Sequence, residues 1–294
     1  MLCVQPNRPL NPIAVSVMRE VDAVAQDLHL SYFLMGAMAR DVLLGHVFGL
    51  NTGRATRDMD FAFAIEGWEQ FQQIQDRLIA GGHFVAVRDI THRLLFRPGC
   101  NVQEYMVELL PFGGVEQPMH TIAWPPDMQR LMSVAGYSDV LKTAPLVQVA
   151  TGLIIHIVSL PGLAMLKLFA WKDRGLEGGK DAIDLVTLCR CYTDAGNLDR
   201  LYEEGMSALQ SVDFDVELAG AWLLGKDMAA TASQQTRVQL QVLLSDAYVS
   251  KQLVNDMVKA IRSREDAVIY AAQLLDQFTR GFASDVDHES KATS

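Results

Sequence analysis

Apolar residues recur along this chain with two different periods, and its second half uses only one of them. Up to about residue 115, helical segments with a 3.6-residue period are interleaved with short apolar or alternating segments typical of strands. Helices are predicted over 12–29, 37–49 and 66–82, and strands over 30–36, from Asp58 onward, and within 83–99 and 101–114. From Pro161 onward, every amphipathic segment has the helical period.

These periods predict an α+β fold, in which a mixed β-sheet flanked by helices precedes a helical C-terminal domain. In the connecting region, residues 125–140 are predicted to be helical and 146–160 to form strands. Further helices are expected over 161–174, 180–194, 197–210, 215–230, 236–263 and 265–282. The predicted domains are 1–158 and 159–285, followed by a polar, disordered tail at 286–294.

Composition indicates which partners and which cellular location are expected of such a protein. The 294 residues carry a formal net charge of −10, which argues against a protein that coats nucleic acid nonspecifically but leaves room for a local basic cleft. The longest apolar run, residues 152–166, is too short for a membrane span, and residues 1–12 do not resemble a secretory signal. The four cysteines have no zinc-finger spacing, which favours a reducing, cytoplasmic location.

Candidate chemistry starts at "ATRDMDFAFA" (55–64), where Asp58 and Asp60 precede an apolar strand. Because side chains alternate along a strand, the two carboxylates share a face, roughly 6.5–7 Å apart, while Met59 points into the core. Glu108, in "MVELL", has the same pattern in a later strand. If these strands are neighbours, three carboxylates meet and offer the oxygen ligands that Mg²⁺ or Mn²⁺ prefers. The alternative is that the two aspartates form a solvated surface pair.

The segment "FLMGAMARDVLLG", upstream of this strand, suggests a second part of the site. Gly36 lies at a predicted strand-to-helix turn, where a small residue lets the backbone approach a ligand, and free N–H groups at a helix start favour phosphate. The alternative for Gly36 is an ordinary turn. Arg40 and Asp41 follow in the first turns of the helix, and their alternative is a local surface charge pair.

The pattern "MGAMARDVLLG…RATRDMDFAF" resembles the nucleotidyltransferase superfamily, in which a Gly-Gly/Ser turn precedes an acid-x-acid strand and a third acid follows later. The "ARD-LLG" portion is also similar to poly(A) polymerase and tRNA CCA-adding enzymes. The resemblance implies that Asp58 and Asp60 bind two metal ions, that Glu108 is the third ligand, and that the turn at Gly36 holds a triphosphate. Ala37 stands where the pattern has its second Gly or Ser.

The segment "SLPGLAMLKLFAWKDRGLEGGKDAIDLVTL" resembles AbiEii/MenA-like nucleotidyltransferases, the toxins of type IV toxin–antitoxin pairs. The matching positions are Lys167, Arg174, Asp181 and Asp184. The resemblance implies that Lys167 and Arg174 bind nucleotide phosphates and that Asp181 orients Lys167 or takes part in catalysis, whereas Asp184 is structural. Helical spacing also places Trp171 on the face of Lys167 and Arg174.

Several of these residues also have an interpretation that involves neither catalysis nor ligand binding. Lys167 lies among apolar residues, where a lysine often extends its ammonium group to water. Asp181 and Asp184 begin a predicted helix, where carboxylates are favoured by the helix dipole whatever their function. His92 and His156 lie in strand-like runs and are interpreted as core or edge histidines.

Together, these features predict a metal-dependent enzyme that transfers an NMP from an NTP such as ATP to a hydroxyl and releases pyrophosphate. The resemblance implies an RNA acceptor, such as a tRNA 3′ end, and an antitoxin partner; no membrane association is expected. Two alternatives remain: transfer onto a protein hydroxyl, and a degenerate protein that only binds a nucleotide or a partner.

Overall fold

The computed structural model describes residues 1–51, 56–88, 90–97, 99, 104–175 and 179–284. The chain divides into two compact units, Met1–Ser159 and Leu160–Ser294, and each is described by itself. The predicted disordered tail at 286–294 lies outside the described residues, as do most of the predicted loop at 50–56 and the centre of the glycine-rich loop at 175–179.

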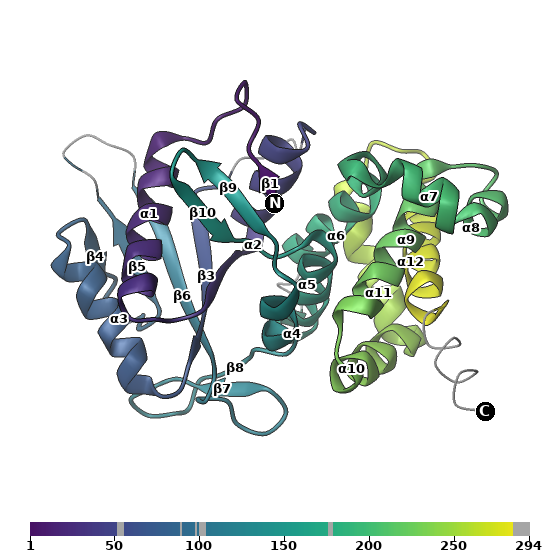
Figure 1. Ribbon diagram of the computed structural model, residues 1–294. Coiled ribbons are helices and arrows are strands. Elements are labelled where there is room, and N and C mark those ends of the chain that lie inside the picture. The colour runs from purple at the N-terminus through teal and green to yellow at the C-terminus, as the bar shows by residue number, and fades with distance from the viewer. Residues whose placement is uncertain (52–55, 89, 98, 100–103, 176–178, 285–294) are drawn as a thin grey trace, which may run out of the picture. The chain divides into compact units, whose positions relative to one another are not determined.

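A five-stranded mixed sheet forms the centre of the first unit (Figure 1). Its strands, in spatial order, are β2 (Tyr32–Met35), β3 (Asp58–Ile65), β6 (Tyr105–Gly113), β5 (Arg93–Phe96) and β4 (Phe84–Ala86). β3 and β6 are parallel, whereas the other neighbouring strands are antiparallel. The mixed sheet and the helical C-terminal region confirm the predicted fold class.

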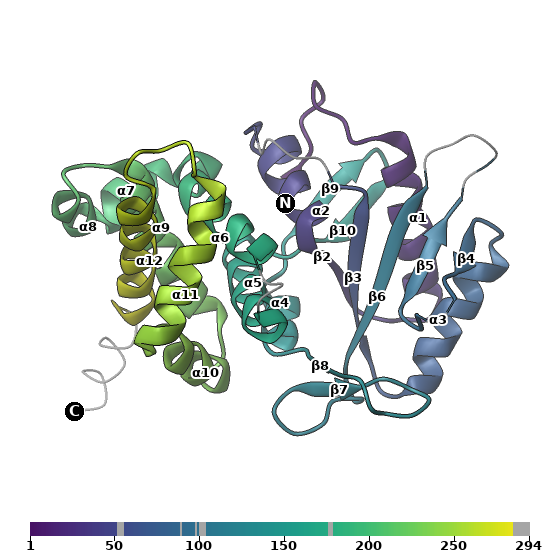
Figure 2. The ribbon, with the colours of Figure 1, turned by 180° about the vertical axis from the view of Figure 1, so that it is seen from behind.

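Two helices, α1 (Pro12–Asp27) and α3 (Trp68–Ala80), lie against one face of this sheet (Figures 1 and 2). On that face Met59 and Phe61 of β3 are fully buried, as their alternation with the aspartates predicts. The opposite face, here called the site face, carries Asp58, Asp60 and Glu108. Helix α4 (Tyr137–Thr143) packs against Phe112 near the far end of β6, so the site face is buried there and accessible where β3 and β6 begin.

Several connecting segments differ from their predictions. The prediction of a helix over 125–140 is wrong for its first part, because β8 (Leu131–Ser133) lies there and pairs with β7 (Thr121–Ala123). Strand pairing there outweighs a local helical pattern, and Gly136 at φ 83° interrupts the backbone before α4. The run 83–99 contains two strands, the antiparallel pair β4 and β5.

The strands predicted over 146–160 are present as β9 (Leu146–Ala150) and β10 (Leu153–His156), which form a small sheet with β1 (Leu2–Cys3). The helix predicted over 37–49 is a short α-helix, α2 (Gly36–Arg40), which continues as a π-helix, η1 (Asp41–Val47). A π-helical segment is rare and often occurs at functional sites.

The second unit is helical in all its described elements. These are α5 (Leu160–Arg174), α6 (Gly179–Cys191), η3 (Thr193–Asn197), α7 (Leu198–Glu204), α8 (Met206–Ser211), α9 (Val216–Thr231), α10 (Gln234–Ser245), α11 (Ala247–Met257), η4 (Val258–Ala260) and α12 (Ala267–Ser284). The single helices expected over 197–210 and 236–263 are each divided, at Gly205 and at Asp246, whose side chain caps α11. In the part of the chain that the structure describes, no helix is long and apolar enough to cross a membrane.

Close backbone contact holds α9 against α12. A Cβ atom added to Gly281 of α12 would lie 2.7 Å from the carbonyl carbon of Trp222, and one on Gly225 of α9 would lie 2.9 Å from that of Phe278. Real Cβ atoms essentially never come this close. Glycine at both positions therefore allows the two helices to approach at backbone distance.

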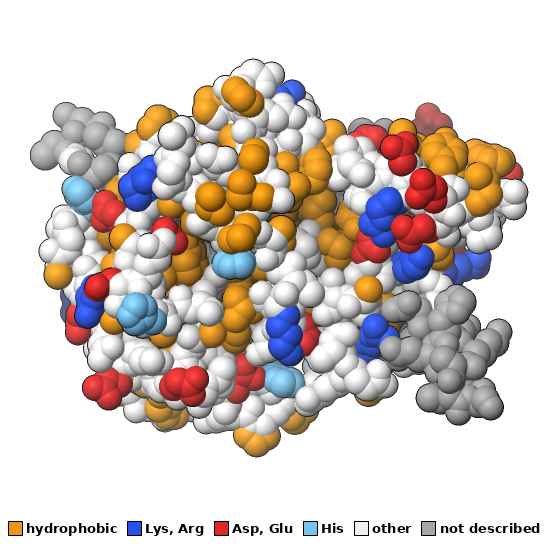
Figure 3. Space-filling model, in the orientation of Figure 1, with side chains coloured by type: hydrophobic (Ala, Val, Ile, Leu, Met, Phe, Trp, Pro, Cys, Tyr) orange, Lys and Arg blue, Asp and Glu red, His pale blue; other side chains and the backbone are white. Residues whose placement is uncertain are grey.

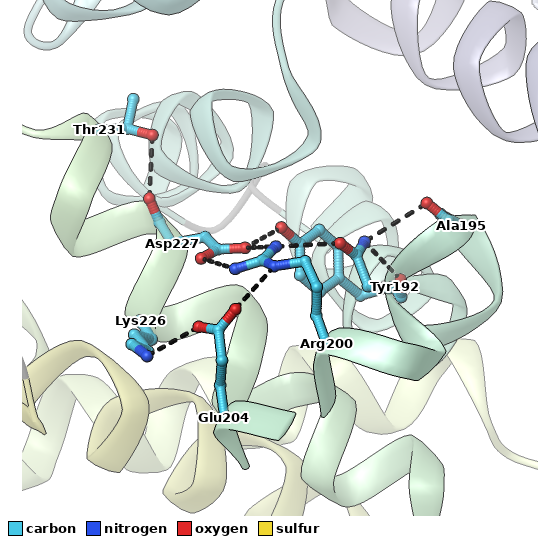
Figure 4. A network of polar contacts seen from close by, with 8 residues as sticks. Tyr192, Ala195, Arg200, Glu204, Lys226, Asp227 and Thr231 are labelled. Atoms are coloured by element: carbon cyan, nitrogen blue, oxygen red, sulfur yellow. Dashed lines mark hydrogen bonds and ion pairs between the residues drawn. The ribbon is translucent and has the colours of Figure 1, made fainter. Parts of the chain in front are cut away.

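Polar contacts hold α7 onto α9 (Figure 4). Asp227 of α9 accepts hydrogen bonds from Arg200 of α7 at 2.8 and 2.9 Å and from the hydroxyl of Tyr192. Glu204 pairs with both Arg200 and Lys226. Apolar side chains gather on the outer surface of this unit (Figure 3). In α7, Leu201 is buried whereas Tyr202 is 48% exposed, so polar contacts supplement the limited apolar burial of this short helix.

Candidate active site

Gly36 forms the strand-to-helix turn that its sequence position predicts, and the turn lies against Asp60. The preceding residue, Met35, pairs with Asp60 across β2 and β3. Gly36 has φ +73°, and a Cβ atom added there would overlap Oδ2 of Asp60 and lie 2.9 Å from its Cγ. Glycine is therefore required both by the backbone conformation and by the space that the carboxylate occupies.

The three predicted carboxylates lie on neighbouring positions of the site face. Asp60 of β3 is the direct partner of Glu108 in β6, and Asp58 is the partner of Met106. Neighbouring strands are about 4.8 Å apart, so Asp60 and Glu108 carry like charges side by side. Asp58 is exposed, and the other two acids are partly exposed. The structure therefore brings together the three acids that the sequence singled out.

Arg93 completes this row and was missed by the sequence reasoning. It lies directly opposite Glu108 in the antiparallel pair of β5 and β6. Its Nε donates to Oε1 of Glu108 at 3.0 Å, and its Nη2 donates to the same oxygen. The strand pattern in "THRLLF" places Arg93 on one face with Leu95, but only the register of β5 with β6 shows which acid it meets.

The donor chemistry fits a hard divalent cation. Carboxylate oxygens are the ligands that Mg²⁺ prefers, and Asp58, Asp60 and Glu108 supply them from adjacent positions. Within the described residues, no group of three or more His, Cys, Asp or Glu side chains is arranged to hold a metal ion. One of the three acids, Glu108, is instead paired with Arg93. The residue types therefore suit a hard cation, but the three side chains are not arranged as a metal site in this structure, and Glu108 is held by Arg93.

Arg40 and Asp41 form a buried ion pair, so the interpretation as a surface charge pair is wrong. Nε of Arg40 donates to Oδ1 of Asp41 at 2.9 Å and Nη2 donates at 2.6 Å, and the two residues are 3% and 9% exposed. The backbone N–H of Thr56 donates to Oδ2 of Asp41 at 3.2 Å, and the backbone N–H of Asp58 donates to the hydroxyl oxygen of Thr56 at 3.3 Å. This chain of bonds links the helix after Gly36 to the start of the acid-bearing strand.

His92 lies beside this row, where an aromatic contact orients it. Its ring packs against Trp124, with centroids 4.8 Å apart and planes at 36°. Burial lowers the pKa of His92 below its ordinary value, although the nearby carboxylate of Glu108 acts in the opposite direction. The contact agrees with the interpretation of His92 as a packed histidine.

In the second unit, Lys167 is held by two aspartates. Its Nζ lies 3.0 Å from Oδ1 of Asp181 and 2.6 Å from Oδ2 of Asp184. The Lys167 side chain is only 11% exposed, so the alternative that it extends to water is wrong. Burial alone would lower the pKa of Lys167, but Asp184 and Asp181 outweigh it and raise this pKa above its ordinary value.

Arg174 shares one of these partners. Its Nη1 lies 2.8 Å from Oδ2 of Asp181, and its side chain is 57% exposed. Asp181 therefore holds both predicted phosphate-binding cations, as expected of a residue that orients Lys167. Trp171, predicted on the same helix face, is buried, and its indole N–H donates to Asp256 at 2.9 Å.

A mixed sheet with an Asp-x-Asp strand beside a strand with a third acid, next to a strand–Gly–helix turn, defines a nucleotidyltransferase. A family model described as "Nucleotidyl transferase AbiEii toxin, Type IV TA system" matches residues 22–236. The chain belongs to this family, and its enzyme class is nucleotidyltransferase. No curated protein matches the chain significantly.

Three solved structures are similar to this chain over most of its length. An antigenic nucleotidyltransferase-like protein from Paracoccidioides brasiliensis is 16% identical, with a TM-score of 0.42, over 71% of this chain and 93% of that one. The antibiotic-resistance factor ANT(2'')-Ia is 14% identical, with a TM-score of 0.34, over 69% and 98%. The Thermotoga maritima CCA-adding enzyme, complexed with tRNA, is 10% identical, with a TM-score of 0.26, over 95% and 83%. Because these TM-scores are low, the assignment of the chain to its family rests on the family model.

Proposed function

We propose that this protein transfers a nucleoside monophosphate from an NTP to a hydroxyl group of RNA, such as a tRNA 3′ end, and releases pyrophosphate. The observation that carries the proposal is the row on the site face, where Asp60 and Glu108 are register partners and Gly36 lies against Asp60. Membership of the AbiEii family supports the reaction class. NTPs and tRNA are both found in the cytoplasm, where we expect the protein to act.

In this proposal Asp58, Asp60 and Glu108 hold Mg²⁺ or Mn²⁺. When bound, such ions neutralise triphosphate charge and help to ionise the attacking hydroxyl. The chain contributes the positions of the acids, which are set by the register of β3 with β6 and by the bonds from Asp41 through Thr56 to the start of β3. A site that is held in place in advance lowers the barrier without reorganisation during the reaction.

The nucleotide-binding roles of Gly36, Ala37, Arg40, Lys167 and Arg174 stay predictions. Of the three cations, Arg40 is the least suited to bind phosphate, because its guanidinium is buried and already paired. Lys167 and Arg174 are held by Asp181, and Arg174 is also exposed. Lys167 is also largely buried and paired, with two aspartates, so burial and pairing favour Arg174 over Lys167, and phosphate binding by either residue stays a prediction.

Nucleotidyl transfer is tested by incubating the protein with radiolabelled NTPs and total RNA. Asp60→Asn keeps the shape of the side chain and removes its charge, and we expect label transfer to fall roughly 10²–10³-fold, as when one stabilising group is lost from an active site. Glu104→Gln is the matched control, since Glu104 is an exposed acid that pairs with Arg97 just beyond the ends of β5 and β6. Undiminished transfer by Asp60→Asn would defeat the proposal. Label in protein bands instead of RNA would identify a protein acceptor.

The family also implies a biological setting, in which the enzyme is a toxin and an antitoxin opposes it. We expect induced expression to arrest growth, expression of Asp60→Asn to be harmless, and co-expression of a cognate antitoxin to restore growth. Arrest by the Asp60→Asn variant would separate toxicity from nucleotidyl transfer.

A further inference from the structure

Three charged side chains on three neighbouring strands form one row on the site face. Asp60 of β3 is opposite Glu108 of β6, and Glu108 is opposite Arg93 of β5. Like charges directly opposite each other on neighbouring strands repel, and opposite charges attract. Arg93 is therefore the group that compensates the second of two adjacent carboxylates.

The ion pair between Arg93 and Glu108 is of a kind that can exchange one partner for another. Both hydrogen bonds from Arg93 fall on Oε1 of Glu108. The two side chains are 31% and 24% exposed, so water reaches the pair. Partly exposed ion pairs contribute little net stability and can exchange one partner for another at low cost.

We propose that Arg93 is a positioning residue that competes with the divalent metal for Glu108, an inference that rests on the proposed function. In the absence of metal, Arg93 holds the carboxylate of Glu108. The third metal ligand becomes available only when this ion pair opens. Metal binding to the protein alone is therefore weaker than it would be without the competing charge of Arg93.

Mn²⁺ affinity measured without NTP tests this competition directly. Free Mn²⁺ is followed by electron paramagnetic resonance during titration of the full chain. Arg93→Gln removes the competing charge, and we expect Mn²⁺ to bind about tenfold more tightly, the lower end of the effect of an opposite charge within 4–6 Å. Arg93→Lys keeps a positive charge, so its affinity should stay near that of the wild type.

The chain offers a matched control one residue pair beyond the strands. Arg97 pairs with Glu104 across the continuation of β5 and β6, at 2.6 Å, and both side chains are about half exposed. Arg97→Gln removes the same charge from the same hairpin, away from the row, and should leave Mn²⁺ affinity unchanged. Thermal denaturation of every variant checks that the fold is retained.

Two results would overturn the competition. One is an equal Mn²⁺ affinity for Arg93→Gln and Arg97→Gln. The other is an undiminished effect of Arg93→Gln in a Glu108→Gln background, which would show that Arg93 acts by general charge and not through Glu108. The proposed function fails separately, if the wild type transfers no nucleotide although Arg93→Gln tightens Mn²⁺ binding.

Discussion

Substitution of Gly36 by alanine perturbs the candidate site at a single point. Gly36 has φ +73°, and the added methyl group would overlap Oδ2 of Asp60. Two costs are therefore expected: backbone strain from a left-handed conformation, and displacement of the carboxylate. Because the overlapping oxygen ends a side chain, it can rotate away without opening the sheet.

The first cost affects the stability of the protein, and the second affects its activity. A left-handed conformation costs a residue with a Cβ atom about 1–2 kcal/mol, which lowers the free energy of unfolding by that amount. The carboxylate oxygen has to move by more than about 1 Å to clear the methyl group, and a displacement of about 1 Å near reacting atoms can already cost about 10²-fold in rate. The variant should thus be mildly destabilised and strongly impaired in activity.

Gly82→Ala is the control that separates the two costs. Gly82 has φ +86°, and a Cβ atom added there would meet nothing within 4 Å. We expect similar losses of unfolding free energy for both variants in urea denaturation, but loss of nucleotidyl transfer only for Gly36→Ala. Full activity of Gly36→Ala would refute the reasoning, because the position of the Asp60 carboxylate would then not matter.

Three further predictions follow from the second unit and from the cysteines. Lys167→Met should lower the free energy of unfolding by about 3–5 kcal/mol, since it removes the largely buried cation that Asp181 and Asp184 share and leaves Asp181 with the exposed Arg174. Lys226→Met, in a partly exposed pair, should cost less than about 1 kcal/mol in the same denaturation assay. Burial raises the pKa of Cys189 to about 12, so a thiol reagent at pH 8 should label the exposed Cys3 in the native protein and Cys189 only after unfolding; rapid native labelling of Cys189 would contradict its burial. For Glu217, burial raises the pKa, but hydrogen bonds from neighbouring side chains outweigh it and lower the pKa below its ordinary value of 4.5. Its contribution to stability is therefore full above pH 4.5 and is lost as pH falls through the folded-state pKa, and Glu217→Gln should weaken the pH dependence of unfolding in this range.

The alternation of apolar and acidic residues was sufficient to predict one side of the site. Because side chains of a strand alternate between two faces, burial of Met59 and Phe61 requires Asp58 and Asp60 to lie opposite them. Alternation along one strand does not show which residues of the neighbouring strands lie beside these acids. Register depends on which strands pair and in which direction, so the positions of Glu108 beside Asp60 and of Arg93 beside Glu108 emerge only from the folded sheet.

Errors in the helical predictions have two physical origins. The apolar residues near 131 find a strand partner, β7, and long-range pairing outweighs the local helical pattern. Long amphipathic stretches after residue 190 contain residues that end or begin helices, such as Gly205 and the capping Asp246. A 3.6-residue period shows that a stretch is helical, but it does not show where one helix stops and the next begins.

Burial separates the roles of Arg40 and Arg93. Arg40 is 3% exposed and fixes Asp41, which in turn holds the backbone of Thr56 ahead of the acid-bearing strand. Breaking a buried ion pair costs about 3–5 kcal/mol, so this pair is suited to hold the strand in place throughout a reaction. Arg93 has a similar fork of bonds but is partly exposed. A partner change there costs about 1 kcal/mol or less, and so Arg93, not Arg40, is the arginine able to release a carboxylate when a cation competes for it.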